Sequence, residues 1–457
     1  MNIKKSIALL SAVIMLGMTL TACGGKDDDA GDDAEISVIT DGTEPQGEGD
    51  STAATSFEDP AAQLGIDVSQ VTDVEGNAVT EAATEATLPD NHDEIVQMIQ
   101  DAQNGVDTTS TVQVMTEYNI DYTDRYAYNQ LSDAEKELYV KILNAANSLK
   151  LKVEVDDTVT TEMWTRAYGC VCMQEPELFW ISSARVKVGQ VYYWETDESI
   201  IAERQAQIDE TVSSILSAVN GMTEYETLKY FHDYIVLNNT FSLVDVIDEG
   251  AEKQTIYGAL VTGSIQCEGY AKAMMYLCDM AGIECVVVTG TNESNETHAW
   301  NCVKLDGNWY NVDTTWDDPI LSVEDKTNLR YNYFLVPDSW IHSISHFNVN
   351  QKIGGTELTY FTPPTCTSEE YNYFKVEGKL YDNVDDADAA IRAAMKESAE
   401  NKVRVAEIRV TSQEIYDEIT ANLSEYANWI KSENSSVTKV TSNCDANLLI
   451  IELGLVY

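Results

Sequence analysis

Three side chains of different chemistry, Cys267, His298 and Asp313, are spaced so that one nucleophilic site can contain all of them. A thiolate attacks acyl carbons, an imidazole carries protons to and from the reacting atoms, and a carboxylate orients the imidazole. These are the three parts of a thiol enzyme of the nucleophile, base and orienter kind. This hypothesis requires that the chain folds so that the three side chains lie close together.

Cys267 is predicted to begin an amphipathic helix. The residues after it are apolar at helical spacing, and Gly282 is expected to stop the helix. The apolar positions are Tyr270, Ala271, Met274, Leu277, Cys278 and Ala281. In the first turn, unpaired backbone N–H groups and the positive end of the helix dipole favour a thiolate over a thiol.

His298 and Asp313 are predicted to come from one β-hairpin. Asp306-Gly307 is a strong two-residue turn signal between runs at 297–305 and 308–316. This register places Leu305 opposite Asn308 and Trp300 opposite Asp313, and alternation puts His298, Trp300, Asp313 and Thr315 on one face. His298 is then a diagonal neighbour of Asp313, about 7 to 8 Å away, within reach of a leaning imidazole and carboxylate.

The stretch C-E-G-Y-A at 267–271, followed by H-A-W-N-C-V-K-L-D-G-N-W-Y-N-V-D-T-T-W-D-D at 298–318, resembles the bacterial transglutaminase-like superfamily. The fold of that family is related to papain-like cysteine proteases. The resemblance covers about residues 220 to 340, and Pro176 to Trp180 is similar to sequences that precede such domains. It implies an α+β core in which a helix with Cys267 packs on an antiparallel sheet carrying His298 and Asp313. It also implies that Cys267 is the nucleophile, His298 the general base and acid, and Asp313 its orienter.

Acyl transfer also needs donors for the developing oxyanion. The backbone N–H of Cys267 is the expected first donor. Asn239, Phe241 and Tyr257 lie where an upstream second donor is expected, but no pattern selects one of them, and Phe241 has no polar group.

The first residues predict an export signal and a lipid anchor. Lys4 and Lys5 precede the apolar run 7–20, and Leu20-Thr21-Ala22-Cys23-Gly24 resembles a bacterial lipobox. We expect residues 1–22 to be a signal peptide and Cys23 to carry the lipid, which tethers the protein outside the cell membrane. An ordinary signal peptide is the alternative. Residues 23–110 are acidic and poor in aromatic side chains, which predicts a disordered spacer, with a short helix at 91–103 left open.

The net charge of −49 excludes binding of nucleic acid as an expected function, because phosphate recognition needs clustered Lys and Arg. The same charge favours neutral or basic peptides as substrates. The oligomeric state is left open.

Three further regions are expected: a helical and strand region at 111–220, a transglutaminase-like domain at 221–366, and a small α+β domain at 367–457. Capping boxes at Ser132–Glu135 and Thr223–Glu226 predict two helix starts. The first of these helices is expected to turn Leu138, Ile142, Leu143 and Leu149 inward, and Asp385 or Asp386 is expected to cap a later helix. The other predicted helices are 161–172, 200–219, 228–238, 387–398 and 413–431, and the predicted strands are 179–188, 191–195, 373–380, 403–410 and 448–455.

Metal and cofactor chemistry is not expected. Cys170 and Cys172 are too few for a structural zinc site, and His342 and His346 lack the acidic motif of a metalloprotease. Of the nine cysteines, seven remain besides Cys23 and Cys267. Disulfide pairing cannot be assigned for an odd set. Cys278, Cys285 and Cys302 are interpreted as core residues.

Two functions fit this sequence. The preferred one is an extracytoplasmic thiol enzyme that forms a thioester on Cys267 and passes the acyl group to water or an amine. Hydrolysis is favoured because water needs no second substrate pocket. The alternative is a binding module that keeps the fold without turnover and binds peptides or cell-envelope components.

Overall fold

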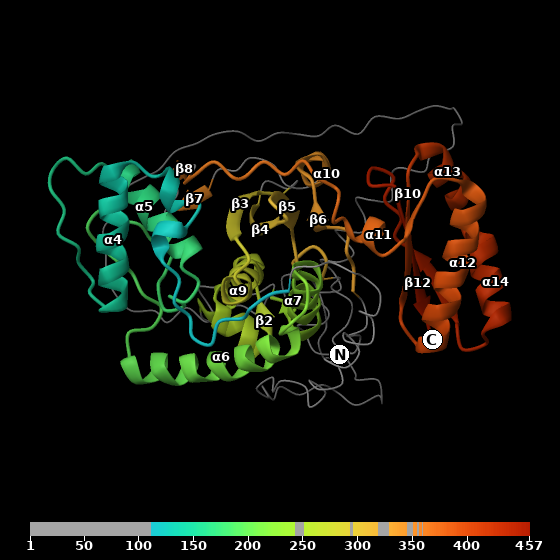
Figure 1. Ribbon diagram of the computed structural model, residues 1–457, viewed down its shortest axis with the longest axis horizontal. Helices are drawn as coiled ribbons and strands as arrows, with labels where there is room; N and C mark the ends of the chain where they lie inside the picture. The colour runs from blue at the N-terminus through green and yellow to red at the C-terminus, as the bar shows by residue number, and fades with distance from the viewer. Residues whose placement is uncertain are drawn as a thin grey trace, which may run out of the picture. The chain divides into compact units, whose positions relative to one another are not determined.

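The computed structural model describes residues 111–242, 251–292, 296–318, 329–344, 351–353, 356–358 and 360–457 (Figure 1). All of these belong to the compact unit Glu85–Tyr457. The predicted signal peptide, lipid-bearing Cys23, acidic spacer, helix at 91–103 and His346 lie outside the described residues. Within the described part of the chain, no helix has the length and apolar character needed to cross a membrane.

The region before the predicted thiol domain is helical. Its helices are α4 (Asp133–Asn147), α5 (Thr161–Gln174) and α6 (Glu198–Val219), with short 3-10 turns η2 (Tyr122–Asp124) and η3 (Tyr128–Gln130). The capping box before α4 is confirmed, because Ser132 and Glu135 each bond the other's backbone N–H. Leu149 does not belong to this helix. It lies past the helix end with a φ of 50°.

The prediction of two strands at 179–188 and 191–195 is wrong. The described residues there form only isolated bridges, Ile181 with Tyr193 and Lys187 with Gln190. The Ser182 hydroxyl accepts a hydrogen bond from the backbone N–H of Ala184 (3.3 Å). Such local side-chain bonding competes with a β ladder, so the paired segment is interrupted between its two bridges.

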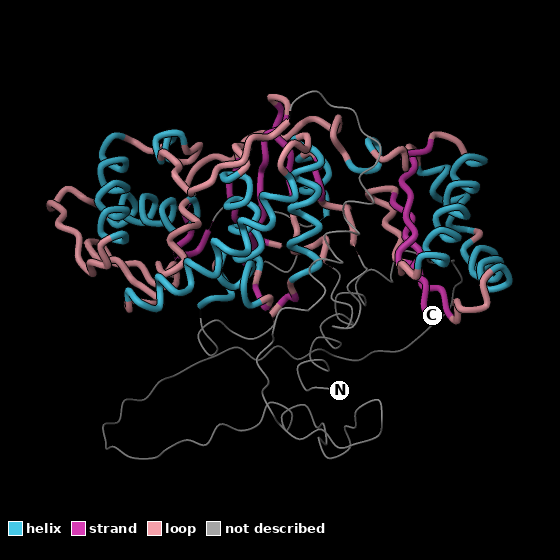
Figure 2. Tube along the Cα trace, turned by 60° about the horizontal axis from the view of Figure 1, so that its bottom comes forward, coloured by secondary structure: helices cyan, strands magenta, loops and turns pink. Residues whose placement is uncertain are grey.

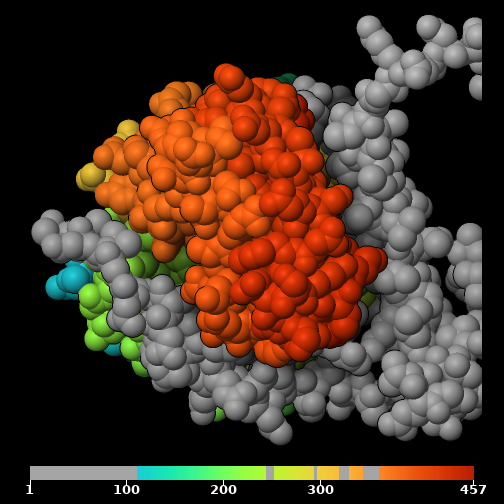
Figure 3. All heavy atoms as spheres, turned by 90° about the vertical axis from the view of Figure 1, so that its right-hand side faces the viewer, coloured from blue at the N-terminus to red at the C-terminus, as the bar shows by residue number. Residues whose placement is uncertain are grey.

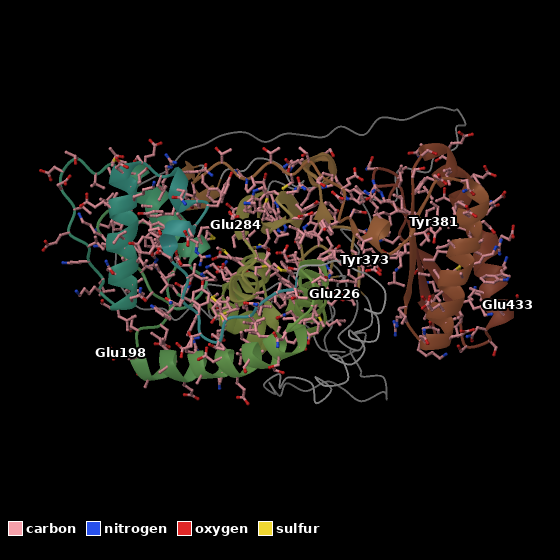
Figure 4. The ribbon with its side chains drawn as sticks, in the orientation of Figure 1. Glu198, Glu226, Glu284, Tyr373, Tyr381 and Glu433 are labelled. Atoms are coloured by element: carbon pink, nitrogen blue, oxygen red, sulfur yellow. The ribbon has the colours of Figure 1, made fainter. Side chains whose placement is uncertain are left out.

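A four-stranded antiparallel sheet and two helices form the core of the chain. The strands are β3 (Cys285–Thr291), β4 (Thr297–Leu305), β5 (Asn308–Val312) and β6 (Phe334–Val336), in that order across the sheet. Helix α9 (Cys267–Met280) packs on β3 and β4, and α7 (Glu224–Asn238) packs on α9 (Figure 1). Glu226, labelled in Figure 4, closes the predicted capping box at the start of α7 with Thr223. The expected α+β core is therefore confirmed.

Short elements connect α7 to α9 and follow the sheet. Between the helices lie β1 (Thr240–Phe241), η4 (Ala251–Gln254), the π-helix η5 (Gly258–Thr262) and β2 (Ser264–Ile265), with β1 parallel to β2. Gly263 ends η5 in the left-handed region (φ 73°), which a glycine adopts without strain. After the sheet come α10 (Asp338–Ile344) and the pair β7 (Gln351–Ile353) and β8 (Thr356–Leu358).

The C-terminal residues form a small α+β layer with its own apolar core. Helix α11 (Tyr373–Val376) comes first, and its buried Tyr373 and Phe374 belong to the larger core. The further elements are β9 (Leu380–Tyr381), α12 (Val384–Asn401), β10 (Val405–Val410), α13 (Gln413–Ala421), α14 (Leu423–Glu433), β11 (Lys439–Ser442) and β12 (Ile450–Val456). The sheet order is β11-β12-β10-β9, and α12, α13 and α14 cover one side of it (Figure 2). In the face shown in Figure 3, these residues, orange to red, form a continuous surface.

Three predictions in this layer are corrected. The strand expected at 373–380 begins instead as helix α11, because the N–H groups of Lys375 and Val376 both bond the carbonyl of Asn372. Asn383, not Asp385 or Asp386, caps α12, since its side chain accepts from the backbone N–H of Asp386.

The single helix expected at 413–431 is two helices, which break at Asn422. The amide of this residue bonds the carbonyl of Glu418 (3.0 Å), and its hydrogen-bonding side chain favours a helix end over continuation. Strand β11 was not predicted, because its residues are mostly exposed and polar and give no apolar alternation.

Candidate active site

Cys267 is the first residue of α9, as predicted, and it is half-buried. The preceding turn η4 packs directly on this end of the helix: the N–H of Gln266 donates to the carbonyl of Lys253 (2.8 Å). A Cβ on Gly269 would lie 2.6 Å from that same carbonyl oxygen, so only glycine fits there. The close packing fixes the thiol at the positive end of the helix dipole.

The predicted hairpin register is confirmed over the paired residues. Leu305 lies opposite Asn308, and Asp306 and Gly307 form the turn with φ values of 49° and 80°. Both values are positive, as a two-residue hairpin turn of this twist requires.

The second strand ends earlier than predicted, at Val312, so Asp313 does not pair opposite Trp300. The carboxylate explains the departure. Its Oδ1 accepts hydrogen bonds from the backbone N–H groups of Thr315 (2.9 Å) and Trp316 (3.2 Å), which turns the chain out of the ladder. Thr315 therefore lies in a turn and not on the strand face with His298.

His298 joins the other two residues of the site. Its Nε2 lies 2.6 Å from Oδ2 of Asp313, and its side chain also hydrogen-bonds Cys267. Since Asp313 occupies Nε2, Nδ1 is the nitrogen left for the sulfur. His298 is 5% exposed, and the carboxylate behind it is fully buried. The structure thus brings all three predicted residues into one chain of contacts.

The electrostatics of the site favour a charged imidazole. Burial lowers the pKa of His298, but the negative charge and hydrogen bond of Asp313, with a smaller contribution from Cys267, raise it to about 10. His298 is therefore an imidazolium at neutral pH. A cation in contact with a sulfur atom is an arrangement that suits nucleophilic chemistry.

Two indoles flank the imidazole. The ring of Trp300 stacks at a centroid distance of 6.1 Å and that of Trp316 lies tilted at 6.1 Å. Trp300 is held in place by a hydrogen bond from its Nε1 to the side chain of Asn311 (3.1 Å). These rings pack against the imidazole and limit the rotation of His298.

The three upstream positions named as possible oxyanion donors make the following contacts. The amide of Asn239 donates to the carbonyl of Ile235 (2.8 Å), and Phe241 pairs with Ile265 in β1 and β2. The ring of Tyr257 lies under the guanidinium of Arg204 at 4.8 Å.

It was not predicted from the sequence that the side-chain amide of Gln254 lies near the start of α9. Gln254 ends η4, is half-buried, and its Nε2 donates to Oε1 of Gln266 (3.4 Å), the residue before Cys267. No spacing rule points to this residue, because its approach to α9 depends on the fold of η4.

The remaining candidate residues are placed as follows. Cys278, Cys285 and Cys302 are buried, as interpreted from the sequence. Cys302 and Cys366 bring their sulfurs to 3.8 Å. Across the described ranges, no three His, Cys, Asp or Glu side chains gather where they could hold a metal ion. The imidazole of His342 lies 3.7 Å from the carboxylate of Asp338, on its own helix.

Comparison with known proteins identifies the family of one domain of this chain. Residues 214–314 match the Transglutaminase-like superfamily. Human kyphoscoliosis peptidase is 28% identical over 139 residues, which cover 28% of this chain and 21% of the relative. The mouse kyphoscoliosis peptidase is 37% identical over 87 residues, covering 16% of this chain and 13% of the relative.

A solved structure described as the crystal structure of a TGase aligns at 21% identity and a TM-score of 0.23, covering 26% of this chain and 33% of that one. The matched residues of this chain span about a fifth of the length of human kyphoscoliosis peptidase. Residues 214–314, which include Cys267, His298 and Asp313, thus form a transglutaminase-like domain.

Proposed function

We propose that this protein is a thiol enzyme that cleaves peptide amides through Cys267, with His298 as base and acid and Asp313 as its orienter. The observation that carries the proposal is the contact chain from the thiol at the start of α9 through His298 to Asp313 at 2.6 Å. A thiolate and imidazolium held in contact are the resting form of a nucleophilic cysteine site.

The reaction follows from these groups. The thiolate attacks the amide carbon, and the carbonyl oxygen becomes an oxyanion beside the first turn of α9. His298 gives its proton to the leaving nitrogen as the C–N bond breaks, which leaves a thioester on Cys267. His298, now neutral, takes a proton from water as the water attacks the thioester, and the acid product leaves with the thiolate restored.

Water is the proposed acceptor, because hydrolysis needs no second substrate pocket. An amine that reaches the thioester would instead give a cross-linked amide by the same steps. The charge of −49 favours neutral or basic peptides over acidic ones. We further propose that the enzyme acts outside the cell membrane, with Cys23 as its lipid attachment site.

The test is incubation of the full-length chain with neutral and basic peptides and a primary amine, followed by mass spectrometry. New peptide termini indicate hydrolysis, and amine adducts indicate acyl transfer. Cys267→Ala should abolish both products while remaining folded. Cys278→Ala, a buried thiol of the same helix, is the matched control and should retain turnover. Wild-type protein that binds these peptides and leaves them intact would overturn the enzyme proposal in favour of a binding module.

A further inference from the structure

Behind the candidate site lies a second imidazole that the reaction does not use. His232, on α7, is fully buried, with Nδ1 2.9 Å from Oδ1 of Asp233 and Nε2 3.1 Å from Oδ2 of Asp317. Each ring nitrogen faces a carboxylate oxygen, and an imidazolium satisfies both contacts by donating from both nitrogens. Burial lowers the pKa of His232, but its bonds to the two carboxylates raise it above the ordinary value.

The surroundings of His232 balance its charge. On the same helix, Lys229 donates to Oδ2 of Asp233 (2.9 Å) and to the hydroxyl of Tyr331 (3.0 Å). The ring of Tyr331 stacks on the imidazole at 5.0 Å. Two cations and two carboxylates therefore form a buried set without net charge. An apolar core of equal volume is often as stable or more so, and the set is not explained by stability alone.

Asp317 connects this set to the residue that orients His298. Its two carboxylate oxygens accept from the backbone N–H of Tyr333 at 3.0 and 3.2 Å. The carbonyl of Tyr333 in turn accepts from the N–H of Asp313 (3.0 Å), and the N–H of Asp317 donates to the carbonyl of Asp313 (3.1 Å). The backbone of Asp313 is thus held on both sides by contacts that end at Asp317, one at its carboxylate through Tyr333 and one at its own backbone N–H.

The next residue ties the same turn to the helix of the thiol. The hydroxyl of Tyr270, one turn after Cys267 on α9, donates to Oδ2 of Asp318 (2.5 Å). The turn 313–318 is therefore linked to α7 through Asp317 and to α9 through Asp318. The distance between the thiol and the carboxylate that orients His298 depends on this turn.

We propose that His232 is a positioning residue, which acts through Asp317 to hold Asp313 against His298. The proposal rests on the function proposed above. Without His232, Asp317 would be a buried carboxylate that has lost its cationic partner, and it would take up a proton. Its charge-assisted bonds to the N–H of Tyr333 would weaken, the turn would relax, and the 2.6 Å contact between Asp313 and His298 would lengthen.

The test is the pH dependence of Cys267 alkylation by iodoacetamide in the full-length chain, read by peptide mass spectrometry, so it needs no substrate. His232→Gln should slow alkylation at neutral pH by about tenfold to a hundredfold, as expected for a misplaced reacting group, and should move the pH midpoint upward. Asp317→Asn should act in the same direction while keeping the shape of the side chain. In the double variant of both, the two amides can bond each other and should restore part of the rate.

The matched control is Asp279→Asn, which breaks the buried pair of Arg125 and Asp279 (2.8 Å) at the other end of α9. It should lower the melting temperature and leave the midpoint unchanged. A folded His232→Gln or Asp317→Asn protein with the wild-type midpoint would overturn the proposal, as would an equal shift in Asp279→Asn. Failure of the enzyme proposal looks different, because Cys267 labelling would then still depend on His232 and Asp317, but the wild type would show no turnover of peptides.

Discussion

Replacing Asp313 with asparagine removes one negative charge from the site and keeps the shape of the side chain. In the wild type, burial alone would lower the pKa of His298, and the charge and hydrogen bond of Asp313 raise it from 6.5 to about 10. Each pH unit corresponds to about 1.4 kcal/mol, so the protonated form of His298 is favoured by about 5 kcal/mol relative to an ordinary histidine. With Asp313→Asn, the largest contributions that raise the pKa of His298 are lost, and the pKa should fall towards 6.5.

The loss of the imidazolium should be visible at Cys267. An ordinary thiol with a pKa of about 8.5 is only about 3% ionised at neutral pH, whereas a thiolate paired with an imidazolium is largely ionised. Alkylation of Cys267 at neutral pH should therefore slow by about thirtyfold in Asp313→Asn. The pH midpoint should move to that of an ordinary thiol or above. The assay is iodoacetamide labelling over a pH series, with the Cys267 peptide quantified by mass spectrometry.

Glu284→Gln is the control for this experiment. Glu284, labelled in Figure 4, makes a partly exposed ion pair with Lys304 (2.8 Å), and its exchange for an amide should leave the labelling unchanged. If folded Asp313→Asn protein keeps the wild-type midpoint, then Asp313 does not set the charge of His298, and the electrostatic reasoning is refuted. If both variants shift equally, the change reflects net charge and not the contact at 2.6 Å.

Two more predictions follow from the same site. Gly269→Ala should lower the free energy of unfolding by about 1 to 3 kcal/mol in chemical denaturation, because the new Cβ would lie 2.6 Å from the carbonyl oxygen of Lys253. The rate of Cys267 labelling should change as well. An unchanged free energy of unfolding would contradict the close packing at Gly269. The pKa of His298 is raised in the folded state, so its stabilising contribution is complete below about pH 6.5 and is lost as pH rises towards about 10. The difference in free energy of unfolding between wild type and Asp313→Asn should shrink over that pH range, and a difference that grows would contradict the assignment.

The hairpin shows what local sequence determines. Asp306-Gly307 specifies a two-residue turn, and that turn alone sets which residues face each other from Leu305 and Asn308 to Asn301 and Val312. The alternation of side chains could not predict that Asp313 lies outside the strand. A carboxylate that bonds its own following N–H groups competes with the ladder, and which arrangement prevails depends on the distant carbonyl of Tyr333 that receives the N–H of Asp313.

The other misses have the same physical origin. Gln254 and His232 carry no spacing signal. Each contacts a residue near the site, Gln266 or Asp317, from an element whose position depends on long-range packing. The start of α11 was mistaken for a strand because Tyr373 and Phe374 favour strands locally. In the structure, Tyr373, labelled in Figure 4, stacks on Tyr331 at 3.8 Å, a contact between residues far apart in the sequence.

The choice between an enzyme and a binding module turns on the buried charges. His298 with Asp313, and His232 with Asp233 and Asp317, all lie in the interior, where ionic groups often contribute no more stability than apolar side chains of the same volume. A peptide-binding groove needs none of these charges, because apolar contacts and backbone hydrogen bonds supply its affinity. A nucleophilic cysteine site uses a cation beside the sulfur and a hydrogen-bonding group behind that cation to orient it, and here that group is a buried carboxylate. The arrangement of the buried charges, joined through one turn to the helix of Cys267, therefore favours acyl chemistry over binding.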